Sequence, residues 1–259
     1  PDFDSGSNCL KEIIQNDIYP SVCRLSDGPE TYFYSQLKPE KEGLDVTIKK
    51  IIQEIYLAFK NIKEPNIMML RFEEVLSSKD DEITQVQKII NQHKGALIPS
   101  SLAKNWEETR YHTPYLRDTM MEHRIFIDTM ETVVPWDKVM SMHSAATKAM
   151  QACDAFHNDK GIIMSHISHI YTHGACMYFI LICPMNIGEE VEQWQAIKKA
   201  MSDAIVANGG SISHHHSIGK DHQQYYLQNQ DKLGLEVLKS IKKQLDPKGI
   251  LNPGKLFDV

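Results

Sequence analysis

The sequence GIIMSHISHIYTHGACMYFILIC, residues 161–183, decides the fold. It contains two apolar runs, Gly161–Tyr171 and Ala175–Cys183, joined by the short connection Thr172-His173-Gly174. β-Branched and aromatic residues are frequent in both runs and favour strands, and a short connection that contains glycine favours an antiparallel turn. We therefore predict a β-hairpin at this position.

On either side of the hairpin, apolar residues recur with the spacing of helices or in short strand-like runs. The expected helices are 4–16, 47–61, 81–93, 102–110, 189–207 and 230–245, with a further long helix that Glu131–Trp136 introduces and that ends near Asn158. The expected strands are 66–74 and 96–100, and 20–28 is a strand or a turn. This alternation indicates an α+β fold, with a largely antiparallel sheet flanked by helices and a helical C-terminal tail. Because the two halves share a β-α-β rhythm, a duplication of ferredoxin-like halves is a further hypothesis.

Composition limits the classes of function. The chain has 259 residues, 42% of them hydrophobic, and a formal charge of −6 with no basic stripe, which argues against a nucleic-acid partner. The five cysteines form no CxxC pair and fit reduced thiols in a cytoplasmic protein. The longest apolar run, Gly174–Pro184, is too short for the roughly 20 residues of a membrane span. The chain starts at Pro1 without methionine, so we expect a piece of a longer protein.

Three adjacent histidines, His214, His215 and His216, follow the glycines Gly209 and Gly210. Histidine titrates near neutral pH, and glycines permit close approach of the backbone to a ligand. The alternative interpretation is a solvated polar loop. In an extended segment His215 would point away from its two neighbours, and one metal ion could not easily bind all three.

A second histidine group is His166, His169 and His173. On a helix the three would share a face and would suit zinc or iron. On a strand His166 and His169 would point to opposite faces, and the β-branched neighbours favour the strand. We therefore expect no metal site, and we retain a histidine-based metal-binding module as the alternative from another class of function.

Two arginines and one tyrosine are further candidates. Arg24 and Arg117 each have an acid nearby, which is typical of surface ion pairs, although a fixed guanidinium also suits a carboxylate, phosphate or flavin oxygen. Tyr178 lies within an apolar strand, where it is either a core residue or a relay for protons. The chain has no glycine-rich phosphate-binding loop of its own.

These candidates lie in one ordered pattern, which resembles the C-terminal part of the FAD-linked oxidases of the vanillyl-alcohol-oxidase type. Within that family the chain is most similar to the alkyldihydroxyacetonephosphate synthases and their bacterial relatives. The matching stretches are residues 1–6 (PDFDSG), 24–27 (RLSD), 115–118 (YLRD), 131–132 (ET), 135–136 (PW), 174–179 (GACMYF), 207–216 (ANGGSISHHH) and 246–247 (DP).

The resemblance implies a cap over the flavin ring, with the FAD held largely by an N-terminal domain that this chain lacks. It predicts a substrate domain at 1–207 and a segment, 208–259, that returns to the FAD-binding domain. It implies catalytic roles for five residues: Tyr178, His214, His215, His216 and the flavin-adjacent Arg117. Arg24, Tyr115 and His166 are the further residues that it places near substrate or cofactor; the animal synthases have an arginine in place of His166.

The implied reaction replaces the acyl group of acyl-dihydroxyacetone phosphate with a long-chain alcohol, a step in ether-lipid synthesis. The tail Leu251–Leu256 resembles that of FAD-dependent oxidases and dehydrogenases of 2-hydroxy acids or alcohols, which is the alternative. The expected partner is a small-molecule or lipid-like substrate. A peripheral membrane contact and a homodimer are further hypotheses. We expect the chain by itself to be inactive, because its cofactor domain is absent.

Overall fold

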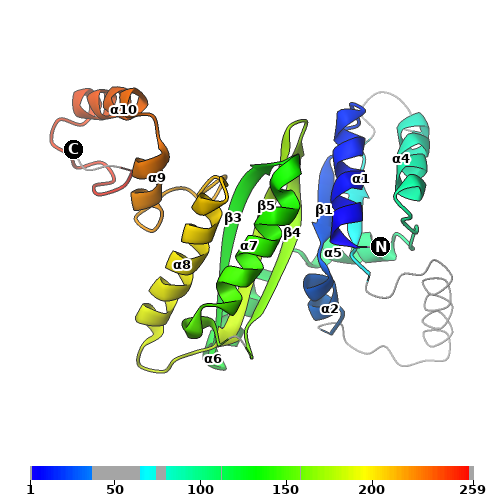
Figure 1. The fold of residues 1–259 in the computed structure, drawn as a ribbon, viewed down its shortest axis with the longest axis horizontal. Coiled ribbons are helices and arrows are strands. Elements are labelled where there is room, and N and C mark those ends of the chain that lie inside the picture. The colour runs from blue at the N-terminus through cyan, green and yellow to red at the C-terminus, as the bar shows by residue number, and fades with distance from the viewer. Residues whose placement is uncertain (1, 37–64, 74–79, 112, 158, 257–259) are drawn as a thin grey trace.

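The computed structural model describes residues 2–36, 65–73, 80–111, 113–157 and 159–256 (Figure 1). Five strands form a single sheet in the order β2-β1-β4-β5-β3, and every neighbouring pair is antiparallel. The strands are β1 (Val22–Ser26), β2 (Met68–Arg71), β3 (Ile125–Pro135), β4 (Ile162–Tyr171) and β5 (Gly174–Pro184). The fold is therefore α+β, as the sequence predicts.

The predicted hairpin is confirmed as β4 and β5, which pair from Ile162 opposite Ile182 to Tyr171 opposite Gly174. Gly174 also faces the edge of β3, where a Cβ atom would lie only 2.3 Å from the carbonyl oxygen of Val134. Only glycine permits this close approach of two backbones. The turn residue thus allows β3 to pair with the full length of β5.

Three helices cover one face of the sheet: α1 (Phe3–Gln15), α7 (Val139–Gln151) and α8 (Glu190–Ala207) (Figure 1). Alternate side chains of β5, Met177, Phe179 and Leu181, point into this layer and are fully buried. Burial of each such side chain stabilises the fold by roughly 1.5–3 kcal/mol. This face is the main hydrophobic core.

The opposite face is covered over only part of its area. Near the end of β5, Ile180 and Ile182 pack with Phe33 of α2 (Gly28–Gln36) and Met120 of α6 (Leu116–Glu122). Toward the start of β5, the same face carries polar side chains instead, with Tyr178 only partly buried. The sheet therefore has one sealed face and one face with an accessible polar region.

Asp27 joins three elements beneath that region. Its carboxylate accepts hydrogen bonds from the backbone N–H of Glu30 at the start of α2, from the N–H and hydroxyl of Ser165 on β4, and from His143 on α7, at 2.9 to 3.1 Å. The residue is 3% exposed. A buried carboxylate satisfied in this way fixes the position of α2 against the sheet.

One predicted element is wrong, and a second is confirmed only in part: the long helix expected after Glu131–Trp136 is present as α7 (Val139–Gln151). Residues 96–100 form no strand but an irregular connection before α5 (Ser101–Thr109). Glu131–Pro135 does not introduce a helix, because it continues β3 and pairs with Gly174–Tyr178; a 3-10 turn at Trp136–Lys138 then leads into α7. The β-branched pair Val133 and Val134 explains the preference for a strand.

The remaining helices are α4 (Asp80–Gln92), α9 (Gln223–Asn229) and α10 (Lys232–Leu245), with 3-10 turns at Thr113–Tyr115 and Asp154–Phe156. The sequence predicts α4 and α10 but not α2 or α9, and the helix expected at 47–61 lies outside the described residues. In α10, Leu233, Val237 and Ile241 are at least half exposed. None of the helices in the described part of the chain is both long and apolar enough to cross a bilayer.

Candidate functional site

A row of polar side chains crosses the accessible face of the sheet. Strand register places Ser26 opposite His166, His166 opposite Tyr178, and Tyr178 opposite Glu131, so the row runs through β1, β4, β5 and β3. Arg24, two residues before Ser26 on β1, adds its guanidinium beside His166 at 3.0 Å. Strand pairing thus brings together residues more than 100 positions apart in the sequence.

His169 joins the same face through an irregularity in β4. The register with β5 shifts between Ile167 and His169, so that Ser168 is an extra residue and His169 pairs with Cys176. Because Ser168 is unpaired, His169 points to the same face as His166 and not to the opposite face that regular alternation would give. The prediction that His166 and His169 point to opposite faces is therefore wrong, although the predicted strand is confirmed.

The histidine loop, residues 211–219, follows α8 and runs along the edge strand β3. The N–H of Ser211 donates to the carbonyl oxygen of Val133 at 3.1 Å, and the hydroxyl of Thr132 donates to the carbonyl oxygen of Ser211 at 2.8 Å. A Cβ atom at Gly210 would lie 2.4 Å from the Thr132 hydroxyl, which explains the glycine. After this contact the loop bends instead of extending, so the three imidazoles do not alternate.

The buried carboxylate of Glu131 binds three consecutive residues of the histidine loop. Oε1 of Glu131 accepts the backbone N–H groups of His214, His215 and His216 at 2.7, 2.5 and 2.6 Å. Burial raises the pKa of Glu131, but the three amide hydrogen bonds lower it more, so its pKa lies below the ordinary value. The carboxylate is therefore ionised and holds the loop as a fixed turn.

Tyr178 lies between imidazoles from the sheet and from the loop. Its ring stacks on His166 with centroids 5.0 Å apart and on His215 at 6.2 Å, and His216 meets it edge-on at 5.1 Å. Burial is the largest cause of a raised pKa for the Tyr178 phenol and of a lowered pKa for His216. At neutral pH the tyrosine is a proton donor and the His216 imidazole is a neutral base.

Arg24, Glu30 and His166 form a closed triad at the other end of the row. Glu30 accepts from Arg24 at 2.7 Å and from Nδ1 of His166 at 2.8 Å, and Arg24 donates to Nε2 of His166. Because arginine only donates, Nε2 carries no proton and His166 is the neutral Nδ1–H form. Burial likewise lowers the pKa of His166. The acid paired with Arg24 is thus Glu30, not the nearby Asp27.

Arg117 and Tyr115 lie away from this cluster. Tyr115 is 71% exposed, and the Arg117 side chain is 61% exposed with its guanidinium 3.6 Å from Asp118. Among the described residues, the structure gives Arg117 no hydrogen bond or ion pair with Tyr178 or with the histidine loop. The fold therefore assembles six of the predicted site residues and leaves these two on α6 and the turn before it. The six are Arg24, His166, Tyr178, His214, His215 and His216.

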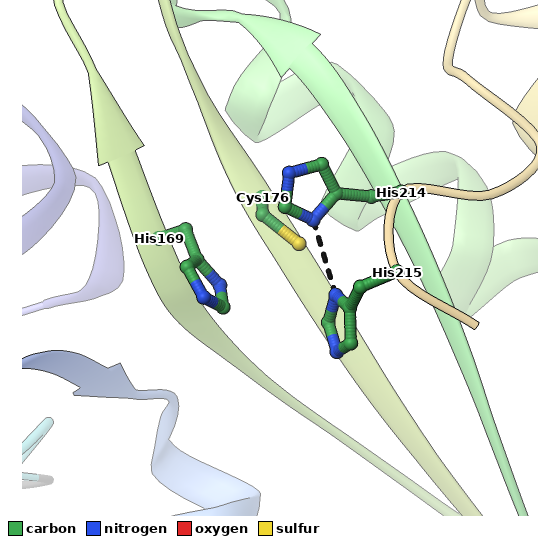
Figure 2. A group of neighbouring side chains, drawn as sticks. All are labelled: His169, Cys176, His214 and His215. Atoms are coloured by element: carbon green, nitrogen blue, oxygen red, sulfur yellow. Dashed lines mark hydrogen bonds between the residues drawn. The ribbon is translucent and has the colours of Figure 1, made fainter. Parts of the chain in front are cut away.

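Four side chains at one end of the face could share a metal ion. Donor atoms of His169, Cys176, His214 and His215 lie within 4.8 Å of one another, and Figure 2 shows the four facing a common space between β4, β5 and the loop. A second such set is Glu131, His215 and His216. Three nitrogens and one sulfur suit tetrahedral zinc. Burial raises the pKa of Cys176 to about 11, so a metal ion would have to displace its proton.

The triad of histidines considered from the sequence is not assembled, because His166 is bound by Arg24 and Glu30. Glu30, Glu131 and Cys176 are the site residues that sequence reasoning does not single out. Glu131 has one signal: of the two acids in the run IFIDTMETVVP, it is the one at a position that alternation places opposite the core face. Glu30 has no comparable signal.

The antiparallel sheet with its histidine-lined face belongs to a known class of flavoenzyme domain. Residues 1–256 match the family described as FAD linked oxidases, C-terminal domain, and the chain belongs to this family.

Its relatives include alkyldihydroxyacetonephosphate synthases and FAD-linked oxidoreductases. Alkyldihydroxyacetonephosphate synthase of Dictyostelium discoideum is 31% identical over 264 residues, which cover 99% of this chain and 42% of the relative. The uncharacterized FAD-linked oxidoreductase YgcU of Escherichia coli K12 is 23% identical over all of this chain and 50% of its own length. A solved structure of alkyldihydroxyacetonephosphate synthase superposes with a TM-score of 0.71 and 26% identity, over 98% of this chain and 42% of that one. The chain thus spans half or less of the length of these proteins.

Proposed function

We propose that this chain is the substrate domain of an FAD-dependent enzyme that exchanges the acyl group of acyl-dihydroxyacetone phosphate for a long-chain alcohol. The observation that carries the proposal is the position of Tyr178 between His166 and the loop imidazoles. The similarity to the synthases over nearly the whole chain supports the same reaction.

The accessible face fits a flavin ring in its chemistry. Tyr178 and the flanking imidazoles present flat rings and polar edges. Within the part of the chain that the structure describes, Arg24 uses two of its five N–H donors on Glu30 and His166, which leaves three for ring oxygens or a substrate anion. The cofactor, bound largely by another domain, would supply the reactive ring on which the exchange takes place.

The side chains of this site supply proton transfer. The exchange releases a fatty acid and forms an ether bond to the alcohol, so it involves no net oxidation. The Tyr178 phenol, kept protonated by its raised pKa, donates a proton to the departing carboxylate. A neutral imidazole of the loop accepts the proton that leaves the substrate carbon and returns it to that carbon after the ether bond has formed, and the phenolate accepts the proton of the incoming alcohol.

The segment 208–259 would return to the FAD-binding domain in this proposal. Support comes from α10, whose apolar residues Leu233, Val237, Ile241 and Leu245 recur every four residues and are exposed. An amphipathic helix normally buries such a stripe. We therefore assign this stripe as a contact with the cofactor-binding part of the enzyme.

A direct assay tests the proposed reaction. The full-length protein is incubated with acyl-dihydroxyacetone phosphate and labelled hexadecanol, and labelled ether lipid is the expected product. Tyr178→Phe should lower the rate about 100-fold or more, as loss of an acid–base group does. Tyr19→Phe is the matched control, because Tyr19 lies in the connection between α1 and β1, is 60% exposed, and should retain full activity when changed. Wild-type protein that binds FAD but forms no ether lipid would overturn the proposal.

The alternative within the family is an FAD-dependent oxidase or dehydrogenase of a 2-hydroxy acid or alcohol. The similarity to an FAD-linked oxidoreductase favours it, and Arg24 with three unused donors could bind a carboxylate. Bleaching of the flavin absorbance on anaerobic addition of 2-hydroxy acids, without ether product, would support this reaction over the exchange.

A metal-binding module is the alternative from another class, and the grouping of His169, Cys176, His214 and His215 favours it. Elemental analysis of the protein purified without chelators tests it. About one zinc per chain, lost in Cys176→Ser, would support metal binding. A zinc content at background level would exclude zinc binding under those conditions.

A further inference from the structure

Glu131 differs from an ordinary loop anchor because both of its oxygens contact the histidine loop. Oε1 accepts three consecutive amides, and Oε2 forms an ion-pair contact with Nδ1 of His215. The side chain is 0% exposed. Amide donors at one oxygen favour the ionised form, which can only accept hydrogen bonds.

This contact determines which nitrogen of His215 carries the proton. An ionised carboxylate beside Nδ1 requires an N–H there, and a neutral imidazole then has a bare Nε2. No hydrogen bond among the described residues uses Nε2 of His215. The ring therefore presents an unshared acceptor nitrogen while it lies stacked on Tyr178.

Two neighbouring histidines lack this property. Both nitrogens of His166 are occupied, by Glu30 and Arg24. Both nitrogens of His214 also have partners, with Nε2 2.7 Å from the Tyr171 hydroxyl and Nδ1 3.1 Å from Nδ1 of His215. His215 thus combines a carboxylate on one nitrogen with an open second nitrogen, the arrangement by which a third group orients a catalytic base.

We propose that Glu131 is a positioning residue that fixes His215 in the Nδ1–H form and so keeps Nε2 available as a proton acceptor beside Tyr178. The use of that acceptor in catalysis rests on the function proposed above. The form of the imidazole does not depend on which reaction the enzyme performs.

The wild-type protein provides the first test. Histidine labelled with nitrogen-15 gives two-bond proton–nitrogen correlations that distinguish the two neutral forms, recorded at about pH 8, where an ordinary imidazole is neutral. The His215 signals are identified by their loss in His215→Gln. The expected pattern has Nδ1 protonated and Nε2 unprotonated. A protonated Nε2 with a bare Nδ1 would overturn the proposal without the need for any variant at Glu131.

Glu131→Gln provides the second test. Its amide oxygen can still accept backbone N–H groups, but its NH₂ group would face Nδ1 of His215 and favour the opposite form. We expect the His215 pattern to invert, and exchange of the loop amides to accelerate about tenfold or more, because a bond to a charged group is worth at least that factor. Faster amide exchange with an unchanged His215 pattern would reduce Glu131 to a loop anchor and overturn the proposal.

The matched control is Glu12→Gln. Glu12 also pairs with an imidazole, Nε2 of His93 at 2.7 Å, but on the outer side of α1 and α4. It should change the His93 signals and leave those of His215 intact. If His215 carries its proton on Nδ1 but the full-length enzyme makes no ether lipid, the proposed function fails and the role of Glu131 stands. If the enzyme makes ether lipid but His215 carries its proton on Nε2, the role of Glu131 alone is refuted.

Discussion

Replacement of Asp27 by alanine should destabilise the protein strongly, because it removes the acceptor that joins α2 to the sheet. Three buried donors lose their partner, namely the N–H of Glu30 and the N–H and hydroxyl of Ser165. Each unsatisfied buried group costs about 1–3 kcal/mol, and partial relaxation keeps the total near the lower end, so we expect a loss of about 3–6 kcal/mol in the free energy of unfolding. His143 is partly exposed and can bind water instead.

Urea unfolding followed by circular dichroism measures this loss. With a slope of about 3 kcal/mol per molar urea for a chain of this size, the midpoint should fall by about 1–2 M. The control is Asp4→Ala, which removes only an exposed bond to Asn8 and should change stability by less than about 0.5 kcal/mol. A loss below about 1 kcal/mol for Asp27→Ala, with an unchanged slope, would refute the assignment of Asp27 as the joint between these elements.

Four further outcomes follow from the structure. Gly174→Ala should lower the melting temperature, because the new methyl group would lie 2.3 Å from the carbonyl oxygen of Val134 and overpacking costs about 1–3 kcal/mol; an unchanged melting temperature would contradict that approach. Phe179→Ala, at a fully buried core position, should cost about 3–5 kcal/mol in urea unfolding. Because the pKa of Glu131 is lower in the folded protein, its carboxylate contributes stability above the unfolded pKa near 4.5 and loses this contribution as the pH falls through the lower folded pKa. The stability of Glu131→Gln should therefore fall less with acid than that of wild type, as urea unfolding midpoints at pH 6 and pH 3.5 would show. Of the five free thiols, Cys153 is the one not fully buried and should react first with a thiol reagent, as peptide mapping of the labelled protein would establish.

Much of the fold could be predicted because the signal is local. The hairpin of β4 and β5 and the helix α8 each depend on residues close together in the sequence, where periodicity and glycine placement are informative. The secondary structure of residues 131–135 is harder to predict, since a run that ends in Val-Val-Pro is compatible with the approach to a helix until its pairing with β5 is known. Local propensity does not distinguish such a segment from a strand when the pairing strand lies far away in the sequence.

The candidate site depends on contacts that no local pattern contains. Resemblance indicated Tyr178 and the histidine loop, but Glu131 contacts that loop across more than 80 positions, and Glu30 meets His166 across 136. Carboxylates are common on surfaces, so neither acid is distinctive until the sheet is assembled. The position of His169 on the accessible face could not be predicted either, because it depends on one unpaired residue, Ser168.

That extra residue acts as a phase shift in the alternation of β4. Deletion of Ser168 would let His169 follow Ile167 directly, so His169 would still pair with Cys176 and stay on the accessible face. If Ser168 itself paired with Cys176 in a regular strand, His169 would lie opposite Ala175 and turn toward the hydrophobic layer. The register of this one residue therefore decides whether an imidazole lies beside Cys176 or is directed into the core.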